Sequence, residues 1–573
     1  MKFLDLVKVY EQLEATSSGN KLREILSDFF KKVPKQEIEK VTYMTLGTIA
    51  SDFEDINLGM ADKMVVRAIA NAVGKDNAEV KQIFKAEGDV GKTAEKTVAG
   101  KTAKLQIDEV FNGLHKIASA SGSGSQDVKV TTLANLLKKA TPKEARYLAR
   151  IVLGTLRMGV GDMTVLDALS ITFTGTKANK PRLEHAFNIC PDVGIIAKTI
   201  ASKGLKGIDK IGVAVGRPIK MMLAQRVTDI ETIKEKMPSG IAAEEKYDGE
   251  RIQAHFSKGK LVLFSRRMED ITNQFPDVCK QIKANLKAKE FVVEGEAVAI
   301  DEKGNLLPFQ RLMQRRRKYD VEAYVKKIPV CIYLFDLLYL NSRSYIREDY
   351  PKRHKALEKI AKKETKNLQI AKRIVCDDIE CIEEFFNKSL QRGCEGIIAK
   401  STAGDSVYKT GMRGWLWIKW KREYSTELAD TFDLVVVGAF AGRGRRAGTY
   451  GALLCAAYNK KTDSFETVCK LGSGFTDEHL AKLPKRFKKY LMNKKPARAV
   501  INKAMKPDYW FEPKIVVEVL GAELTRSPIH SCSEKQGKGL ALRFPRFKRY
   551  REDKKPEQAT TTKEILALYG KKR

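Results

Sequence analysis

Cysteine and histidine are scarce in this sequence, and their spacing excludes two kinds of structure. The 573 residues include nine cysteines and six histidines. The cysteines occur singly, with no C-x-x-C pair and no histidine at the spacing that zinc ligands keep. We therefore expect neither a zinc site nor a disulfide framework.

Long hydrophobic runs are absent as well. The N-terminal stretch MKFLDLVKVYEQLEATSSGNKLREIL carries a charge every few positions. Such a segment is neither the apolar core of a secretory signal nor a membrane span. The sequence thus predicts a cytoplasmic protein with no membrane partner.

Acidic residues are the minority among the charged ones. Aspartate and glutamate number 71 against 105 lysines and arginines, which gives a formal net charge of +34. A field of this sign concentrates polyphosphate backbones, so nucleic acid is the leading partner class. The alternative is a lysine-rich surface that serves only solubility.

The chain is long enough for several domains, and its first third has a helical pattern. Up to about residue 210 the apolar residues recur at helical spacing, as at Phe3, Leu6, Val7, Tyr10 and Leu13. Glycine-rich stretches at 119–137 and 156–169 interrupt this pattern. Glycines before a helix expose N–H groups that can hold phosphate, although an ordinary helix–helix turn explains each stretch equally well.

The pattern changes twice further along the chain. Short apolar runs such as RIQAHF, FVVEGEAVAI and EGIIAKS have the composition of strands and are separated by a few helical stretches. Later, DLVVVGAFAGRGRRAGTYGALLCAAY and IVVEVLGAEL have the pattern of a small antiparallel barrel. We predict a helical domain at 1–213, an α+β domain at 214–425 and a β-barrel domain at 426–573.

One lysine, Lys246, lies within a group of acids in the stretch EEKYDGER. An amine becomes a nucleophile when burial or nearby cations lower its pKa, and Arg251 with the lysines of WIKWK are candidate cations. Glu244 and Glu245 act in the opposite sense, because carboxylates favour the ammonium form. A divalent metal that neutralises carboxylates and brings a nucleotide triphosphate to the amine would resolve this conflict. On composition alone, a surface charge cluster is the simpler interpretation.

Two further acids fall on a strand that otherwise suits a hydrophobic core. Glu294 and Glu296 in FVVEGEAVA share one face, because side chains alternate along a strand. Burying both is costly unless they are paired or bind a metal. Lys419 and Lys421 also share a strand face, beside Trp417, so this face is suited to anions.

These motifs, in this order, resemble those of the ATP-dependent DNA ligases, in the replicative type shared by archaea and eukaryotes. They are KYDGER from Lys246, SRR from Ser265, EGE from Glu294, YLFDLLYLN from Tyr333, EGIIAK from Glu395, WIKWK from Trp417, and RFPRFKRYREDKKPEQATT near the end. The resemblance covers nearly the whole chain. It implies an all-α DNA-binding domain, an α+β nucleotidyltransferase (adenylation) domain and a C-terminal OB-fold barrel.

The resemblance also implies a reaction. In that family the lysine matching Lys246 attacks the α-phosphate of ATP, which gives a lysyl–AMP phosphoramidate and pyrophosphate. AMP then passes to the 5′-phosphate at a nick in duplex DNA, and the neighbouring 3′-hydroxyl displaces it. The nucleotide would be bound by Glu244, Arg251, Arg266, Glu296, Phe335, Arg413, Lys419 and Lys421. The metal, Mg²⁺ or alternatively Mn²⁺, would be bound by Glu296 and Glu395.

Some of these assignments are more specific. Glu244 would contact the adenine edge and Phe335 would stack on the ring, with a plain core aromatic as the alternative for Phe335. Arg551 and Lys554, in an R-x-D-K motif, would orient pyrophosphate in the first step only. A barrel that acts in one step must move between steps, so we expect a hinge near residues 421–430.

The implied partner is nicked double-stranded DNA, bound through its phosphates rather than its base sequence, in replication, repair and recombination. A sliding clamp is expected by family analogy, although no docking motif stands out. We expect a monomer, associated with the nucleoid if the source is archaeal. Whether ADP, GTP or NAD also serves as donor stays open, as does the role of Glu294.

The strongest rivals are the mRNA-capping guanylyltransferases and the RNA ligases, which share the lysine-nucleophile core. The helical first third argues against both, since in the resemblance it corresponds to a DNA-binding domain. The absence of zinc-finger cysteines disfavours an NAD-dependent ligase. A nucleic-acid scaffold without activity would have lost Lys246 or the acids, and all are present.

Overall fold

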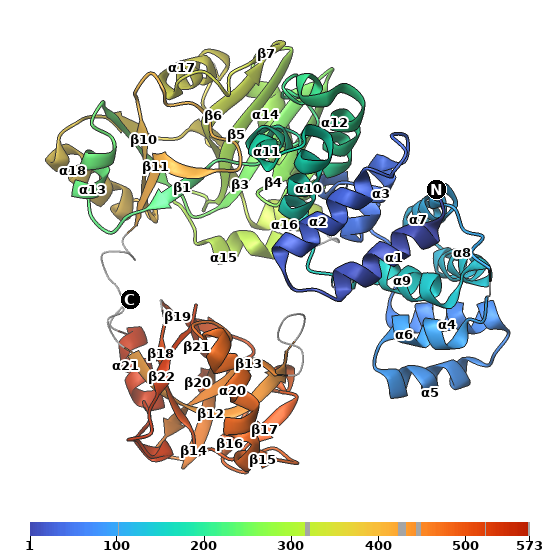
Figure 1. The fold of residues 1–573 in the computed structure, drawn as a ribbon. Helices are drawn as coiled ribbons and strands as arrows, with labels where there is room; N and C mark the ends of the chain where they lie inside the picture. Colours follow the sequence, from blue (N-terminus) through green and yellow to red (C-terminus); the bar gives the residue numbers. More distant parts are fainter. Residues whose placement is uncertain are drawn as a thin grey trace. The chain divides into compact units, whose positions relative to one another are not determined.

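The computed structural model describes residues 1–54, 56–100, 102–156, 158–315, 321–361, 363–421, 431–442, 449–521 and 523–570. The chain divides into two compact units, Met1–Lys421 and Arg422–Arg573 (Figure 1). Most of the predicted hinge at 421–430 and of the loop GRGRRAGTYG lies outside the described residues. In the part that the structure describes, no helix is both long and apolar enough to cross a membrane.

The first unit begins with a helical region, as predicted. Its helices are α1 (Phe3–Glu14), α2 (Gly19–Phe30), α3 (Ile38–Leu46), α4 (Asp62–Val73), α5 (Asn77–Glu87), α6 (Val90–Thr97), α7 (Ile107–Ser119), α8 (Ser125–Lys139), α9 (Pro142–Val152), α10 (Asp162–Thr174), α11 (Lys180–Ile189) and α12 (Val193–Ile208). The apolar residues that recur at helical spacing in α1 are buried in one core that extends to Ile208. Periodicity therefore identified the faces that pack together.

Local signals set where these helices begin and turn. At α9, the side chain of Thr141 accepts the N–H of Glu144, whose carboxylate accepts the N–H of Thr141. Between α7 and α8, Gly122 and Gly124 both adopt φ of +78°, a left-handed conformation that costs glycine little. The first glycine-rich stretch is thus a turn between two helices, and its contact with phosphate stays a prediction.

The rest of the first unit is a mixed α/β region with two sheets (Figure 1). The first has the order β1-β11-β10-β2-β9, with β1 (Leu223–Arg226), β2 (Ile241–Lys246), β9 (Arg373–Val375), β10 (Gly396–Ser401) and β11 (Arg413–Lys421). The second has the order β4-β3-β5-β6-β7, with β3 (Glu250–Ser257), β4 (Lys260–Ser265), β5 (Glu290–Ala299), β6 (Val330–Leu340) and β7 (Arg343–Ser344), and β8 (Leu368–Ile370) pairs with β6. The helices are α13 (Glu231–Lys236), α14 (Pro276–Asn285), α15 (Phe309–Leu312), α16 (Val321–Lys327), α17 (Tyr350–Ile360) and α18 (Ile379–Gln391).

Each sheet buries one face against helices. In the first sheet, Ile397, Ile418 and Trp420 pack in a core with α13 and α18. The ring of Trp420 stacks on Phe386 with centroids 4.0 Å apart. Because side chains alternate along a strand, the neighbouring residues of β10 and β11 point to the other face. That face is the one available for a site.

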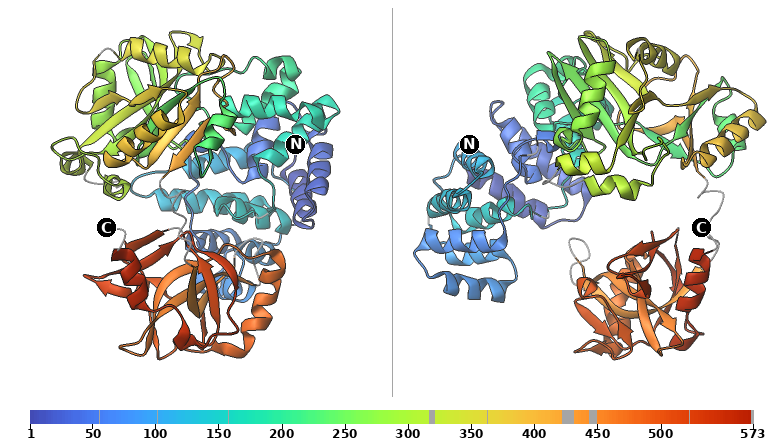
Figure 2. Two further views of the ribbon diagram at one scale, coloured as in Figure 1. Left: turned by 90° about the vertical axis from the view of Figure 1, so that its left-hand side faces the viewer. Right: turned by 180° about the vertical axis from the view of Figure 1, so that it is seen from behind.

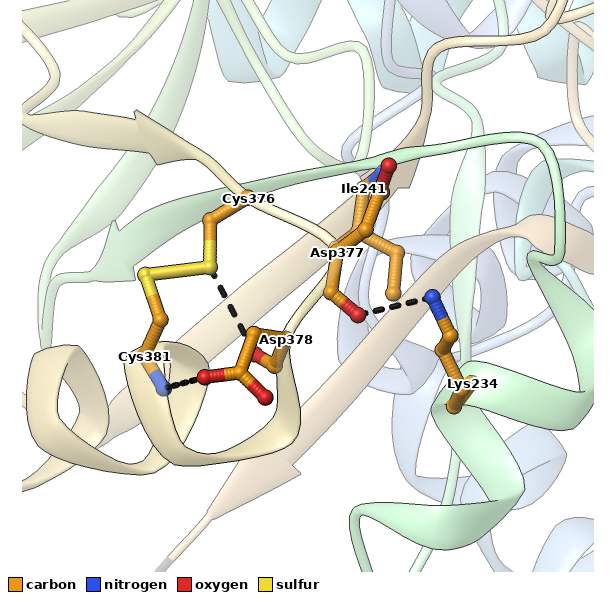
Figure 3. The surroundings of a disulfide bond; sticks show 6 residues. All are labelled: Lys234, Ile241, Cys376, Asp377, Asp378 and Cys381. Carbon is orange, nitrogen blue, oxygen red and sulfur yellow. Dashed lines mark hydrogen bonds between the residues drawn. A yellow bond between two sulfur atoms is a disulfide. The ribbon is translucent and has the colours of Figure 1, made fainter.

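A single disulfide joins Cys376, just after β9, to Cys381 in the first turn of α18 (Figure 3). In the same loop, the carboxylate of Asp378 accepts the N–H of Cys381 at 3.3 Å. The ammonium of Lys234 donates to the carbonyl of Asp377 at 2.7 Å. The other seven cysteines are free. The two cysteines are separated by 5 positions in the sequence, so this link joins the end of β9 to the start of α18 rather than distant parts of the fold.

The second unit is β-rich, as predicted, and its larger sheet curls into a half-barrel (Figure 2). That sheet contains β12 (Thr431–Ala441), β13 (Tyr450–Asn459), β14 (Ser464–Leu471), β15 (Leu491–Met492), β16 (Ala499–Val500), β17 (Tyr509–Phe511), β18 (Val516–Leu520) and β22 (Arg546–Tyr550). A second sheet has the order β19-β21-β20, with β19 (Glu523–Ser527), β20 (Cys532–Lys535) and β21 (Lys538–Arg543), and the helices are α20 (Asp477–Phe487) and α21 (Thr562–Gly570). One pairing, β14 with β16, is parallel, so the barrel is not purely antiparallel as expected.

The order of helical, mixed and β-rich regions confirms the predicted fold class. The helical and mixed regions belong to the same compact unit. The boundaries at 213/214 and 425/426 therefore stay predictions.

Candidate active site

A cavity of about 420 Å³ opens in the mixed region of the first unit. The cavity is lined by every residue of the first unit that the resemblance assigned to nucleotide, metal or catalysis: Glu244, Lys246, Arg251, Arg266, Glu296, Phe335, Glu395, Arg413, Lys419 and Lys421. Arg551 and Lys554 belong to the second unit. The lining residues come from both sheets of the region. The fold thus brings together in one place residues that are far apart in the sequence.

Strand alternation separates the acids that flank Lys246. Glu245 lies on the opposite face of β2, where it pairs with Arg392 and accepts the Tyr247 hydroxyl at 2.7 Å. Glu244 pairs instead with Lys400, at 2.7 Å. The conflict that the sequence raised is therefore removed, because each of these acids has a cation of its own.

The ion-pair partner of Lys246 within the described ranges is Glu395. The Nζ atom of Lys246 lies 2.5 Å from Oε2 of Glu395, and Lys421 Nζ lies 2.7 Å from the same oxygen. Burial raises the pKa of Glu395, but the two ammonium groups outweigh burial and hold it below its ordinary value. Glu395 is thus a carboxylate that fixes the amine at the cavity wall.

Backbone pairing creates this arrangement. Glu395 donates its N–H to the carbonyl of Lys246 at 2.8 Å, just before β10 pairs with β2. The next residue, Gly396, has φ of +148°, and a Cβ there would lie 2.2 Å from the carbonyl oxygen of Trp420. Only glycine permits so close an approach of β10 and β11. The glycine of EGIIAK therefore sets the distance between the acid and the lysines.

Cations dominate one side of the cavity. Burial, reinforced by Lys421 and Lys246, lowers the pKa of Lys419 to about 8. Arg413 and Arg266 lower it further through their charge. Like charges held this close favour the arrival of an anion, and a phosphate would relieve their mutual repulsion.

The two acids on β5, Glu294 and Glu296, differ in position and in partners. Glu296 lines the cavity, where burial raises its pKa to about 7. Glu294 is fully buried and lies behind the wall, 2.8 Å from the guanidinium of Arg251. Arg251 also donates to the carbonyl of Met222 at 2.8 Å. Glu294, whose role the sequence left open, thus holds Arg251 in place.

Aromatic rings form the other end of the cavity. Phe335 and Trp417 meet edge to face with centroids 6.2 Å apart. The guanidinium carbon of Arg251 lies 5.3 Å from the centroid of each ring. A flat, apolar wall beside an arginine suits a nucleobase. Phe335 therefore lines the cavity as well as packing against the core, and its stacking on a base stays a prediction.

Sequence reasoning missed two residues at this end. Lys400 lies at the end of EGIIAK, on the cavity-facing side of β10, and is buried against Glu244. Tyr350, the first residue of α17, donates its hydroxyl to Glu244 from more than a hundred residues away. Lys400 lies two residues after Ile398, so strand alternation puts both side chains on the same face of β10, and both line the cavity. The sequence could therefore have indicated Lys400. Tyr350 carried no such signal, because only the fold brings α17 to β2.

The acids offer a partial metal site. Within the described ranges, no group of three or more His, Cys, Asp or Glu side chains is arranged to hold a metal ion. Glu296 and Glu395 do line the same cavity. Magnesium commonly binds one or two carboxylates and completes its shell with water and substrate phosphates. Two acids beside a cationic face therefore fit such an ion.

Three family models match the chain in succession. Residues 2–170 match the DNA ligase N terminus, residues 221–421 the ATP dependent DNA ligase domain, and residues 446–554 the ATP dependent DNA ligase C terminal region. Among solved structures, a chain named Pmar-Lig_PreS3 aligns with a TM-score of 0.56 over 95% of this chain and 99% of that one, at 18% identity. The structural likeness concerns the fold.

Curated relatives are similar over almost the whole chain. DNA ligase 2 of Thermofilum pendens is 47% identical over 98% of this chain and 96% of its own. DNA ligase of Sulfophobococcus zilligii is 46% identical over the same shares. DNA ligase 1 of Methanosarcina mazei is 42% identical over 99% of both. With the family models in this order and relatives this similar, the chain belongs to the ATP-dependent DNA ligases, which seal nicks in DNA.

Proposed function

We propose that this ligase stores AMP covalently on Lys246 before it seals a nick. One observation carries the proposal: the Nζ atom of Lys246 lies on the wall of the cavity, 2.5 Å from Glu395 and beside the cationic face of β11. The amine would attack the α-phosphorus of ATP. A nitrogen–phosphorus bond forms. The bond between the α-phosphorus and the oxygen that bridges it to the β-phosphorus breaks, and pyrophosphate leaves.

The side chains around Lys246 have separate tasks in this step. The amine must lose a proton before it attacks, and Oε2 of Glu395 is an acceptor within hydrogen-bond reach. Lys419 and Lys421 would hold the α-phosphate and offset the charge that develops on it. Arg266 and Arg413 line the same side and would contact the ribose or the phosphates.

The aromatic end of the cavity would hold the base. Phe335 would stack on the adenine ring, and Glu244 would accept a hydrogen bond from its amino group. Arg251, fixed by Glu294, would lie between the base and the sugar. Support comes from the edge-to-face contact between Phe335 and Trp417. It also comes from the positions of Glu244, which lines the cavity, and of Glu294, which holds Arg251.

A magnesium ion would be held by Glu296 and Glu395, and manganese would satisfy the same oxygen donors. When bound, it would neutralise phosphate charge. Of the two carboxylates, Glu395 itself holds Lys246. Glu296 lies across from Arg251 where β3 pairs with β5.

We assign residues 1–213 to DNA binding, 214–425 to adenylation and 426–573 to an OB-fold domain. The three family models fall within these bounds, which supports the division. In the last domain, Arg551 and Lys554 would orient pyrophosphate during the first step. By family analogy alone, we also expect a monomer that binds nicked duplex DNA and engages a sliding clamp in the cytoplasm.

The decisive experiment is self-adenylylation. The purified protein is incubated with magnesium and ATP labelled in the α-phosphate, then denatured and examined for label on the chain. The parent and a Lys260→Ala control, which removes an exposed lysine of β4, should be labelled, and Lys246→Ala should not. Absence of label from a parent that binds nicked DNA tightly would overturn the proposal.

A further inference from the structure

We infer that Tyr350 and Lys400 are positioning residues that hold Glu244 as a hydrogen-bond acceptor, so that the cavity selects a purine with a 6-amino group over one with a 6-oxo group. The inference rests on the proposed placement of the base against Glu244. It extends that proposal to donor specificity, which the sequence left open between adenine and guanine nucleotides.

Lys400 is the first of the two supports. Its side chain is almost completely buried, and its Nζ atom lies 2.7 Å from Oε2 of Glu244. The same ammonium donates to the carbonyl of Phe335 at 3.0 Å. It also lies 4.4 Å from the centroid of Trp417. Lys400 therefore ties the acid at the base edge to the strand that carries the stacking ring.

Tyr350 is the second support, and its hydroxyl donates its hydrogen bond to Glu244. The hydroxyl donates to Oε1 of Glu244, and its oxygen accepts from Nη1 of Arg373 at 3.3 Å. Arg373 lies directly across from Glu244 where β9 pairs with β2. A tyrosine has one proton to give. Because Arg373 occupies the oxygen as a donor, that proton is committed to Glu244.

The two supports decide what Glu244 offers to a ligand. Each carboxylate oxygen receives a donor from the protein, and each keeps a further lone pair. Burial holds the pKa of Glu244 above its ordinary value, and the Lys400 ammonium and the Tyr350 hydroxyl limit that rise. A protonated Glu244 would place a further proton among groups that already donate to it, namely Lys400 and Tyr350. These groups thus favour the carboxylate, which accepts and does not donate.

An acceptor of this kind distinguishes the two purine classes. The 6-amino group of adenine donates to it. In the same position a 6-oxo group would place oxygen against oxygen, and the base must shift before its N1–H can reach Glu244, which costs affinity. Without Tyr350 or Lys400, Glu244 is free to turn or to take up a proton, and the distinction weakens.

The test compares ATP with inosine triphosphate, which has the 6-oxo group without the 2-amino group of GTP. The quantity is kcat/KM for adenylylation or inosinylation of Lys246, measured as pyrophosphate release. The variants are Tyr350→Phe, which removes only the hydroxyl, and Lys400→Met. Tyr333→Phe is the control, since Tyr333 is a buried tyrosine of β6 that does not line the cavity.

We expect the parent and Tyr333→Phe to prefer ATP by about a hundredfold or more, and Tyr350→Phe and Lys400→Met to lose at least about tenfold of that preference. A ratio within about twofold of the parent in both variants overturns the inference, as does a parent without preference. If Lys400→Met fails to fold, Tyr350→Phe decides alone. Failure of the lysyl–AMP proposal is distinguishable, because the parent would then carry no label on Lys246.

Discussion

Among the cavity residues, Lys419 loses its charge at a lower pH than an ordinary lysine. Burial and the neighbouring ammonium groups lower the pKa of Lys419 to about 8. A lowered pKa means that the ammonium is present below that pH and lost above it. Since kcat/KM reports the ionisation of the free enzyme, we expect self-adenylylation to fall above about pH 8, approaching about tenfold per unit.

Lys419→Arg tests the source of that fall. A guanidinium keeps its charge throughout the range, so the alkaline limb should move beyond about pH 9 even if the absolute rate drops. The measurement is pyrophosphate release from ATP between about pH 6 and pH 10. Lys260→Arg, at an exposed position of β4, is the matched control. An unmoved limb in Lys419→Arg would assign the titration to another group.

Single residues also show how far the sequence could predict the site. Alternation along strands placed Lys419 and Lys421 on one face, and both line the cavity. It also placed Glu294 and Glu296 on one face, but of these two only Glu296 lines the cavity. Alternation also separates Glu245 from Lys246, which composition alone had treated as one cluster. Tyr350 was out of reach, because a hydroxyl on a distant helix gains its function only from the strand it meets. The chemical roles of all these residues stay predictions.

At the scale of elements, strand pairing in the half-barrel positions the R-x-D-K motif. Asp433 lies on β12, which pairs with β18, and β18 pairs with β22 just before Arg551. Nη1 of Arg551 lies 3.0 Å from both carboxylate oxygens of Asp433, and Lys554 Nζ lies 2.6 Å from one of them. One acid, two strands away in the sheet, thus contacts both cations of the motif.

Asp433→Asn should therefore separate the steps of the reaction. An amide gives up the charge that holds both cations, so we expect self-adenylylation to slow by about tenfold. Sealing of a nick that already carries AMP should stay within about twofold, because the motif is proposed to act on pyrophosphate alone. Asp463→Asn, which disturbs an exposed pair with Arg498, is the control. An equal loss in both reactions would assign Asp433 to the stability of the barrel.

The elements themselves were predicted unevenly. Runs such as FVVEGEAVAI gave β5 almost to the residue, because a strand buried on both faces has a clear composition. The parallel pairing of β14 with β16 had no such signal, since β16 is only Ala499–Val500. A strand that short depends on partners far along the chain rather than on its own residues.

At the scale of the whole molecule, the net charge of +34 favours binding to a polyanion. A DNA ligase acts on a polyanion whose bound counterions are released on binding, so affinity falls as salt rises. For several phosphate contacts, we expect the dissociation constant of a nicked duplex to rise by about a hundredfold or more between about 50 and 200 mM salt. Two nicked duplexes of unrelated sequence should agree within about twofold, because phosphates carry no base information.

Self-adenylylation provides the internal control for this prediction. It uses ATP and Lys246 without DNA, and the cavity shields its charges from the solvent more than an open surface does. Its salt dependence should therefore be much weaker than that of duplex binding over the same range. If duplex affinity stays flat while adenylylation proceeds, the charge excess serves solubility, and DNA recognition rests on uncharged contacts. If both fall together, salt acts on the folded state, and a thermal unfolding curve at each concentration would show it.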